Sequence, residues 1–283
     1  MALAAAGRFP VTRRRIARAS RSADRLGEQA IFYLEALASV PKAAVRYKRE
    51  TLRLVAEISM GSGALAVIGG TVVIVGFLTL FAGATIAVQG FSSLGNIGVE
   101  ALTGFFAAFI NVRIAAPVIA GIGLAATIGA GSTAQLGAMR VSEEIDALES
   151  MAIPSVPYLV STRVLAGMIA IVPLYSLAVI ASFIASRFAT VVIYAQSSGV
   201  YDHYFDTFLI PTDILWSFAQ AIVMALAVML IHTYHGYTAS GGPVGVGVAV
   251  GNAVRASLIA VVTVTLLISL AIYGSSGNFN LSG

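Results

Sequence analysis

Long apolar stretches without charged side chains alternate with short polar segments along this chain. The first covers residues 58–99, forty-two positions with no Asp, Glu, Lys or Arg. A helix rises about 1.5 Å per residue, so roughly 20 apolar residues cross a hydrocarbon core about 30 Å thick. Stretches of suitable length lie at residues 64–88, 114–139, 164–186, 214–232 and 256–273. The pattern predicts an all-α polytopic membrane protein with five transmembrane helices.

Composition and the absence of linkers support one membrane domain. Apolar residues make up 58% of the 283 positions and charged residues only 11%, which is outside the usual composition of soluble domains. No long polar segment separates the spans. We therefore expect a basic leader over residues 1–57, a membrane domain over residues 58–273 and a short tail over residues 274–283.

The basic residues are concentrated ahead of the first span, which predicts the topology. Twelve of the seventeen lie there: Arg8, Arg13, Arg14, Arg15, Arg18, Arg21, Arg25, Lys42, Arg46, Lys48, Arg49 and Arg53. Because cytoplasmic flanks carry the excess of Lys and Arg, the N-terminus is expected in the cytoplasm and the tail outside. The loop 189–213 fits, since it contains three aspartates and no basic residue. Arg113 and Arg187, toward the outer side, fit less well.

Part of the leader has the pattern of an interfacial amphipathic helix. In residues 30–40 and 43–58, apolar positions such as Tyr47, Leu54 and Ile58 recur at helical spacing among Arg and Lys. Such a helix lies among the lipid headgroups, and each cation near anionic lipid contributes about 1 kcal/mol. Nucleic-acid binding is the alternative for a basic run, but the adjoining spans favour the membrane.

The loop after the second span predicts a short cytoplasmic helix, at about residues 142–153. Ser142 is a suitable N-cap and Pro154 ends the helix. Ile145, Leu148 and Ala152 fall on one face, as an apolar ridge. A ridge of this kind docks into a groove on a cytoplasmic partner, whereas the alternative is a solvated connecting helix.

The same loop carries a resemblance to a known family. The segment 137–149 (GAMRVSEEIDALE), with Met151, the Pro154/Pro157 pair and 163–167 (RVLAG), resembles the MlaE/YrbE permeases. These are the membrane subunits of ABC-type lipid transporters that work with MCE-domain proteins. The resemblance continues through residues 89–90, 113–117, 236–237, 241–247 and 253–257. It implies an interfacial helix, five spans, pairing of two permeases and a coupling helix at residues 143–152.

The resemblance also implies the partners and the coupling residues. A cytoplasmic ABC ATPase dimer would bind ATP and Mg and hydrolyse ATP, MCE-domain proteins would lie outside, and the cargo would be a fatty acid, phospholipid or sterol. This chain has no Walker A motif, so we expect a non-catalytic inner-membrane subunit that binds no cofactor or metal itself. The residues implied in ATPase coupling are Glu143, Glu144, Ile145, Asp146, Leu148, Glu149 and Met151.

Three positions depart from the family pattern. Ile114, Thr127 and Gln135 stand where members commonly carry Glu, Arg and Glu. Charges inside a membrane are costly and usually paired or functional, so this chain cannot supply the network that they form. It is similar to the second, B-type permease of actinobacterial Mce (mammalian cell entry) systems. We therefore expect a heterodimer with an A-type paralogue.

Two weaker patterns have an ordinary alternative. Asp202, His203 and Asp206 are metal-ligand types, but on an outer loop they are expected to be solvated. The glycine-rich segment 241–247 is expected to be a tight turn, because no strand precedes it and no Lys-Ser/Thr follows.

A small-residue face in the second span leaves two interpretations open. Gly121, Ala125 and Gly129 recur every fourth residue, and such faces let membrane helices approach closely. Either packing within the chain or a contact between permeases would use this face.

The apolar spans also indicate the class of transporter and the path of the lipid. The alternative to an ATP-driven lipid permease is a scaffold or secondary transporter that needs no ATPase. Ion-driven transport usually requires midplane carboxylates, and the spans contain none, so the lipid permease is favoured. An apolar cavity between two permeases would suit lipid tails. Its candidate lining is Val73, Phe77, Phe81, Leu266, Leu267 and Leu270.

Overall fold

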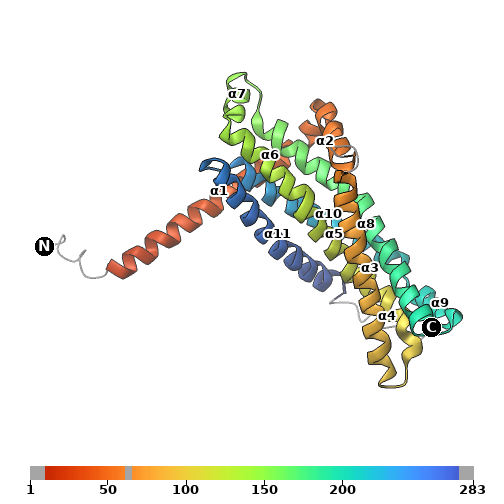
Figure 1. The fold of residues 1–283 in the computed structure, drawn as a ribbon. Coiled ribbons are helices and arrows are strands. Elements are labelled where there is room, and N and C mark those ends of the chain that lie inside the picture. Colours follow the sequence, from red (N-terminus) through yellow and green to blue (C-terminus); the bar gives the residue numbers. More distant parts are fainter. Residues whose placement is uncertain (1–9, 61–65, 274–283) are drawn as a thin grey trace.

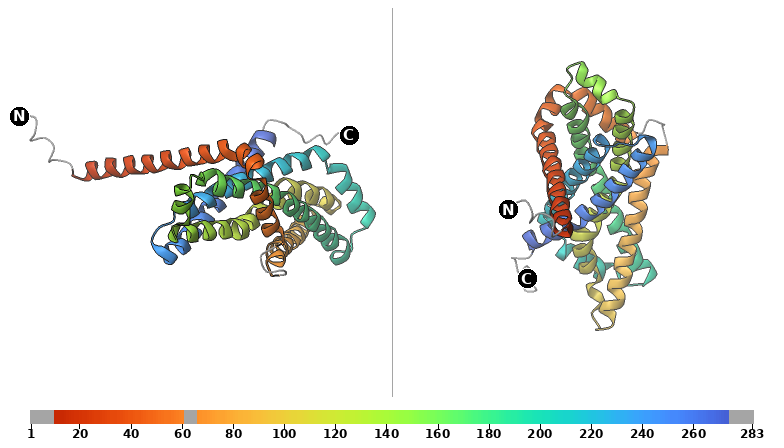
Figure 2. Two further views of the ribbon diagram at one scale, coloured as in Figure 1. Left: turned by 90° about the horizontal axis from the view of Figure 1, so that it is seen from above. Right: turned by 90° about the vertical axis from the view of Figure 1, so that its left-hand side faces the viewer.

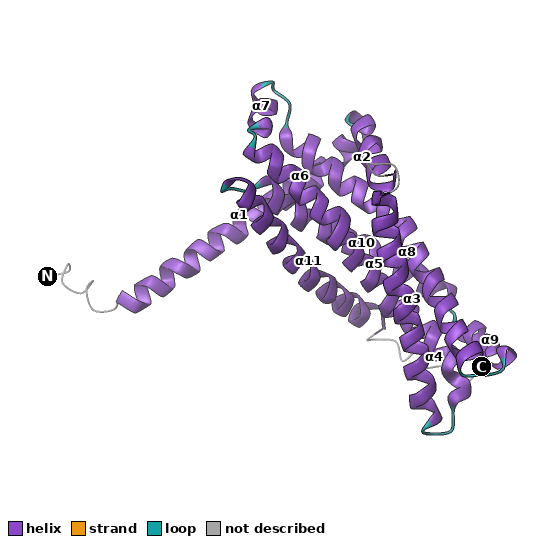
Figure 3. Ribbon diagram, viewed as in Figure 1, coloured by secondary structure: helices purple, strands orange, loops and turns teal. Residues whose placement is uncertain are grey.

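The computed structural model describes residues 10–60 and 66–273, which are helical apart from short turns (Figures 1 and 3). This confirms the all-α prediction, while residues 1–9 and the expected tail 274–283 lie outside the described residues. The elements in chain order are α1 (Pro10–Arg46), α2 (Lys48–Met60), α3 (Ala66–Gly95), η2 (Glu100–Leu102), α4 (Thr103–Ile110), η3 (Asn111–Ala115), α5 (Ala116–Leu124), η4 (Ala125–Gly129), α6 (Ala130–Val141), α7 (Glu144–Ser150), η5 (Val156–Ser161), α8 (Thr162–Phe188), η6 (Ala189–Ile193), α9 (Ser198–Phe208), α10 (Pro211–Tyr237) and α11 (Gly242–Tyr273).

Five stretches of helix are long and apolar enough to cross a membrane, as predicted. They are Thr71–Gly95, Glu100–Val141, Val156–Ile193, Pro211–Tyr237 and Gly242–Ile272. The second and third exceed the predicted lengths because helix continues past the apolar segment at both ends. They therefore rise beyond the membrane core, and α7 and α9 lie at opposite ends of the bundle (Figure 1).

The core lies where α5, α8 and α10 meet. Its largest fully buried side chains include Leu124, Tyr175, Met224 and Met229. Only 11% of the fifth span and 28% of the first are buried, against about half of the second and third. Within one chain, α3 and α11 are therefore peripheral helices, on either side of α5 and α6 (Figure 1).

The interfacial leader forms two helices rather than the shorter segments expected. The first part of α1 extends away from the bundle in Figure 1 and in the left-hand view of Figure 2, and its second part packs at the α7 end. There the Ser161 hydroxyl donates to the Ala36 carbonyl at 2.8 Å, and Phe32 packs against Tyr234 and Tyr237 of α10. The predicted membrane-facing role remains a prediction; apolar side chains available for it are Ile31, Leu34, Val45 and Leu52.

The small-residue face of the second span packs inside the chain. A methyl group on Gly121 would lie 3.2 Å from Met224 of α10 and Val261 of α11, and one on Gly129 would overlap the His232 ring. Ala125 is fully buried. Of the two interpretations left open, intrachain packing is confirmed for these three residues.

A close approach of α3 and α8 depends on Gly83. A methyl group there would lie 2.5 Å from the Ser182 carbonyl oxygen, which is backbone and cannot turn aside. We expect Gly83→Ala to lower the free energy of unfolding by about 1–3 kcal/mol, because the two helices would have to separate. Gly131→Ala is the matched control, since nothing lies within 4 Å of its added methyl. Thermal unfolding in detergent micelles should separate the two variants, and equal midpoints would contradict this account.

Candidate functional site

The helix predicted after the second span is α7, and it is shorter than predicted. It covers seven residues, Glu144–Ser150, and begins after Glu143, which has a left-handed φ of 61°. The N-cap prediction for Ser142 is wrong. Ser142 instead ends α6, and its hydroxyl lies 3.0 Å from the Ala138 carbonyl oxygen and 2.9 Å from the Glu144 carboxylate. The chain turns sharply here, so no extended residue precedes the helix.

Part of the apolar ridge of α7 faces its own chain, and this part is not available to a partner. Ile145 is fully buried and packs with Leu136 of α6 and Leu159 of η5, and the half-buried Leu148 lies against the same cluster. Ala152, the third residue of the ridge, is exposed. The exposed residues around α7 are Glu143, Glu144, Asp146, Ala147, Glu149, Ser150, Met151 and Ala152.

Polar contacts fix α7 to α6, to α10 and to Ser155, the residue that precedes η5. Arg140 of α6 forms a salt bridge with Asp146 at 2.7 Å. The Glu149 carboxylate accepts hydrogen bonds from Ser155 at 2.5 Å and Tyr237 of α10 at 3.1 Å. The bond from Ser155, then that from Tyr237, lowers the pKa of Glu149, so the carboxylate stays charged. Asp146 and Glu149 therefore hold α7 in place.

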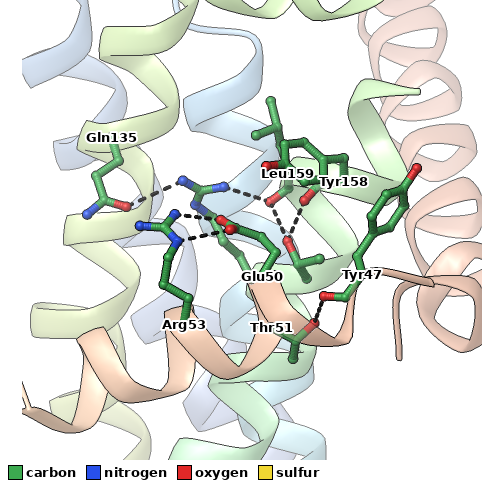
Figure 4. A network of polar contacts seen from close by, with 9 residues as sticks. Tyr47, Glu50, Thr51, Arg53, Gln135, Tyr158 and Leu159 are labelled. Carbon is green, nitrogen blue, oxygen red and sulfur yellow. Dashed lines mark hydrogen bonds and ion pairs between the residues drawn. The ribbon is translucent and has the colours of Figure 1, made fainter. Parts of the chain in front are cut away.

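A second polar network ties α2 to the bundle near the same end (Figure 4). Glu50 pairs with Arg53 one turn later at 2.5 Å, and this bond lowers the pKa of Glu50. Arg163 of α8 donates to the Leu159 carbonyl at 2.9 Å and to the Gln135 side-chain oxygen at 3.4 Å. The charge of Arg163 also lowers the pKa of Glu50. The electrostatic attraction between Glu50 and Arg163 therefore links α2 to α8.

The two arginines that fitted the topology less well are both paired with aspartates near α9. Arg113 of η3 contacts Asp213, in the first turn of α10, at 2.6 Å and lies over the Phe109 ring at 4.1 Å. Arg187 contacts Asp202 of α9 at 2.9 Å. Each arginine is paired with a carboxylate, so neither counts against an extracytoplasmic location of the α9 end of the bundle.

The pairing of Arg187 with Asp202 also accounts for one of the three candidate metal ligands. Asp202 is engaged by Arg187, whose hydrogen bond lowers the pKa of this carboxyl. Among residues 10–60 and 66–273, no group of three His, Cys, Asp or Glu could hold a metal ion. The metal interpretation of Asp202, His203 and Asp206 therefore has no structural support.

The three positions that depart from the family pattern lie on the second span, and their side chains are exposed or half-buried. Ile114 is 46% exposed, Gln135 is exposed and Thr127 is half-buried. Thr127 donates to the Gly123 carbonyl at 2.6 Å within its own helix. The side-chain oxygen of Gln135 accepts from Arg163. The absent charges would have stood at two exposed positions and one half-buried position of this span.

The candidate lipid-path residues are all exposed but lie on two different surfaces. Phe77 and Phe81 of α3 border an apolar groove of about 370 Å³ together with Ile184 and Phe188 of α8. The residues of α11, Leu266, Leu267 and Leu270, are 58–61% exposed on the other side of α5 and α6. One chain alone therefore does not bring the two sets together.

Sequence reasoning missed the residues that hold these sites together. Asp213 is 100 positions from Arg113, and Tyr237 is 88 positions from Glu149. The sequence does show Asp213 at the start of the fourth span and Tyr237 at its end, but neither residue type identifies the side chain that it contacts.

Comparison with known proteins agrees with this architecture. The family described as Permease MlaE matches residues 60–271. A "Probable ABC transporter permease protein" of Rickettsia bellii is 27% identical, over 90% of this chain and 92% of its own length. The "Intermembrane phospholipid transport system permease protein MlaE" of Haemophilus influenzae is 25% identical, over 69% and 76%. The protein TRIGALACTOSYLDIACYLGLYCEROL 1 of Arabidopsis thaliana is 26% identical, over 70% and 57%.

The family match extends from the end of α2 through nearly all of α11, and so includes all five spans and α7. The family match and five helices that are long and apolar enough to cross a membrane make the protein a multi-pass inner-membrane permease, a transporter subunit rather than a catalytic enzyme. This chain belongs to the MlaE permease family.

Proposed function

We propose that this chain is the permease subunit of an ATP-driven lipid transporter, coupled to a cytoplasmic ABC ATPase through α7. The observation that carries the proposal is the construction of α7. This short helix between two spans is anchored by the buried Ile145, by the Arg140–Asp146 salt bridge and by the hydrogen bond from Ser155 to Glu149. Met151, just after the helix, is 63% exposed. A rigid, exposed helix can pass a partner's movement to the spans that it joins.

The orientation of the subunit follows from its charge. The basic leader and α7 lie at one end, and the acidic loop with α9 lies at the other, where both arginines are neutralised. By the excess of Lys and Arg, the α7 end is cytoplasmic and the α9 end faces MCE-domain partners outside.

The coupling surface is the exposed side of α7 rather than its apolar ridge. Glu143, Glu144 and Ala147 line this side, and Met151 stands at its end as an apolar anchor. Flexible methionine side chains fit irregular apolar pockets, and carboxylates attract basic groups. The ATPase groove for α7 should therefore be basic around an apolar pocket.

The lipid path requires a second permease, and the open face of the second span is where we place it. Ile114 and Gln135 are exposed on this span and Thr127 is half-buried. A charged A-type paralogue packed there would bring both sets of apolar side chains to one cavity. Polar solutes would lose several kcal/mol for each unpaired group in such a cavity, whereas lipid tails would not.

Reconstitution tests the proposed function. We expect ATP-dependent lipid transfer from vesicles that contain this chain, the paralogous permease, the ATPase and the MCE proteins. Vesicles that lack the paralogue should show none, because this chain lacks the three charges. Lipid mass spectrometry of the purified assembly identifies the cargo. Transfer of lipid by this chain without a paralogue would exclude the heterodimer, and transfer without the ATPase would favour the secondary transporter.

A further inference from the structure

A pocket of about 700 Å³ lies between the leader helix α1 and the turn that follows α7. Phe32 and Glu35 of α1 form one side, and Glu149 with residues 152–157 forms the other. Tyr237 of α10 also lines it. The pocket therefore joins the interfacial leader, the end of the coupling helix and a transmembrane helix.

The chemistry of the pocket is that of a guanidinium site. Glu35 and Glu149 bring carboxylates from two helices, and neither forms a salt bridge within the part of the chain that the structure describes. Arg140, whose charge lowers the pKa of Glu149, is already paired with Asp146. The rings of Phe32 and Tyr237 lie with centroids 5.4 Å apart. The Arg140 guanidinium lies 5.9 Å from the centroid of the Tyr237 ring, so this ring already faces a cation of the chain itself. No ion pair of the described residues includes Glu35, so a cation beside Glu35 and Phe32 has to be supplied from outside.

We propose that this pocket binds an arginine side chain of the ATPase subunit, as a contact separate from the exposed side of α7. The inference rests on the proposed function, because that function brings the ATPase to this end of the molecule. A planar guanidinium can pair with carboxylates and stack on aromatic faces at once, which a lysine ammonium does less well. A pocket of about 700 Å³ has room for a side chain of this size.

The contact would act on the spans directly. Glu149 accepts hydrogen bonds from Ser155, which precedes η5 and α8, and from Tyr237 at the end of α10. Ser155 is only 4% exposed. A cation seated on Glu149, near the end of α7, is thus one hydrogen bond away from Ser155, just before the third span, and from Tyr237, at the end of α10. Movement of the ATPase would reach both through this one side chain.

Charge reversal at Glu35 tests the proposal, with a matched control on the same helix. Glu28 is exposed on α1 two turns earlier, outside the pocket. In the assembled transporter, we expect Glu35→Arg to weaken ATPase binding about tenfold, because it places a like charge against the incoming arginine. Glu28→Arg should bind the ATPase normally, and both variants should reach the membrane at wild-type levels. Equal loss in the two variants, or no loss at Glu35, would overturn the proposal.

A cross-link identifies the occupant. The chain has no cysteine, so a Glu35→Cys variant carries a single thiol. Combined with ATPase variants in which one surface arginine at a time is replaced by Cys, it should form a disulfide with one of them, and Glu28→Cys should not. If no arginine position of the ATPase forms a disulfide with Glu35→Cys, or if Glu28→Cys forms the same disulfide, the assignment is overturned. If Met151→Asp releases the ATPase while Glu35→Arg does not, this inference fails and the proposed function stands; if neither variant affects binding, both fail.

Discussion

Replacing Asp213 with Asn is expected to leave almost no folded permease. Asp213 is the carboxylate partner of Arg113, whose side chain is buried near the α9 end of the bundle and only 9% exposed. Removing one member of a buried pair leaves an uncompensated charge and costs about 3–5 kcal/mol. That is a large part of the total stability of most proteins. The expected measurement is a monodisperse peak in detergent size-exclusion chromatography for the wild type and aggregate for Asp213→Asn.

The second outer pair supplies the control. Arg187 and Asp202 are joined at a similar distance, but their side chains are 52% and 43% exposed. Exposed pairs contribute little to stability, so Asp202→Asn should give a normal peak. Replacing both members of the inner pair with apolar residues, as Arg113→Met with Asp213→Leu, should recover much of the fold, since no charge is then left unpaired. Equal behaviour of Asp213→Asn and Asp202→Asn would mean that burial does not govern these pairs.

Ile145→Asp and Met151→Asp are expected to fail in different ways, although the two residues are six positions apart. Ile145 is fully buried between α6 and η5, so an aspartate there must enter an apolar cluster without a partner. Loss of the buried side chain alone costs about 2–5 kcal/mol, and the unpaired carboxylate adds to it. We expect Ile145→Asp to reduce the amount of permease in the membrane.

Met151→Asp should leave the permease intact and detach the ATPase. Its side chain is 63% exposed, so the fold loses little. If Met151 anchors the partner, the substitution places a charge in an apolar pocket and weakens binding more than tenfold. Quantitative pull-down of the ATPase, normalised to permease in the same membranes, separates the two variants. Normal ATPase binding by Met151→Asp would mean that this side of α7 is not the docking surface.

Much of the architecture can be predicted from the sequence because membranes impose a simple rule. Backbone groups in a bilayer must be satisfied within the helix, so each long charge-free stretch has to be a span. The five spans, the all-α class and a short helix near Glu143–Glu149 all follow from this rule and from the family-specific segment. The position of the leader helices follows only in part, since α1 runs through Pro41 as one element.

Orientation around each helix could not be obtained in the same way. Periodicity places Ile145 and Leu148 on one face of α7, but it cannot say whether a partner or the chain itself covers that face. The same limit applies to Gly121 and Gly129, whose small-residue face meets α10 and α11. In lipid, every helix face can be apolar, so hydrophobicity does not distinguish an inward side from an outward one.

The lengths of the charge-free stretches and the distribution of Lys and Arg are enough to predict the five membrane crossings, the basic leader and the short acidic helix between the second and third spans. The packing of the helices settles which charges are paired, which side of α7 is exposed and which residues form the pocket at Glu35 and Glu149. These depend on contacts such as Arg113–Asp213 and Glu149–Tyr237, between residues about 90 to 100 positions apart. Local pattern fixes each helix, whereas such pairings exist only once the helices have packed.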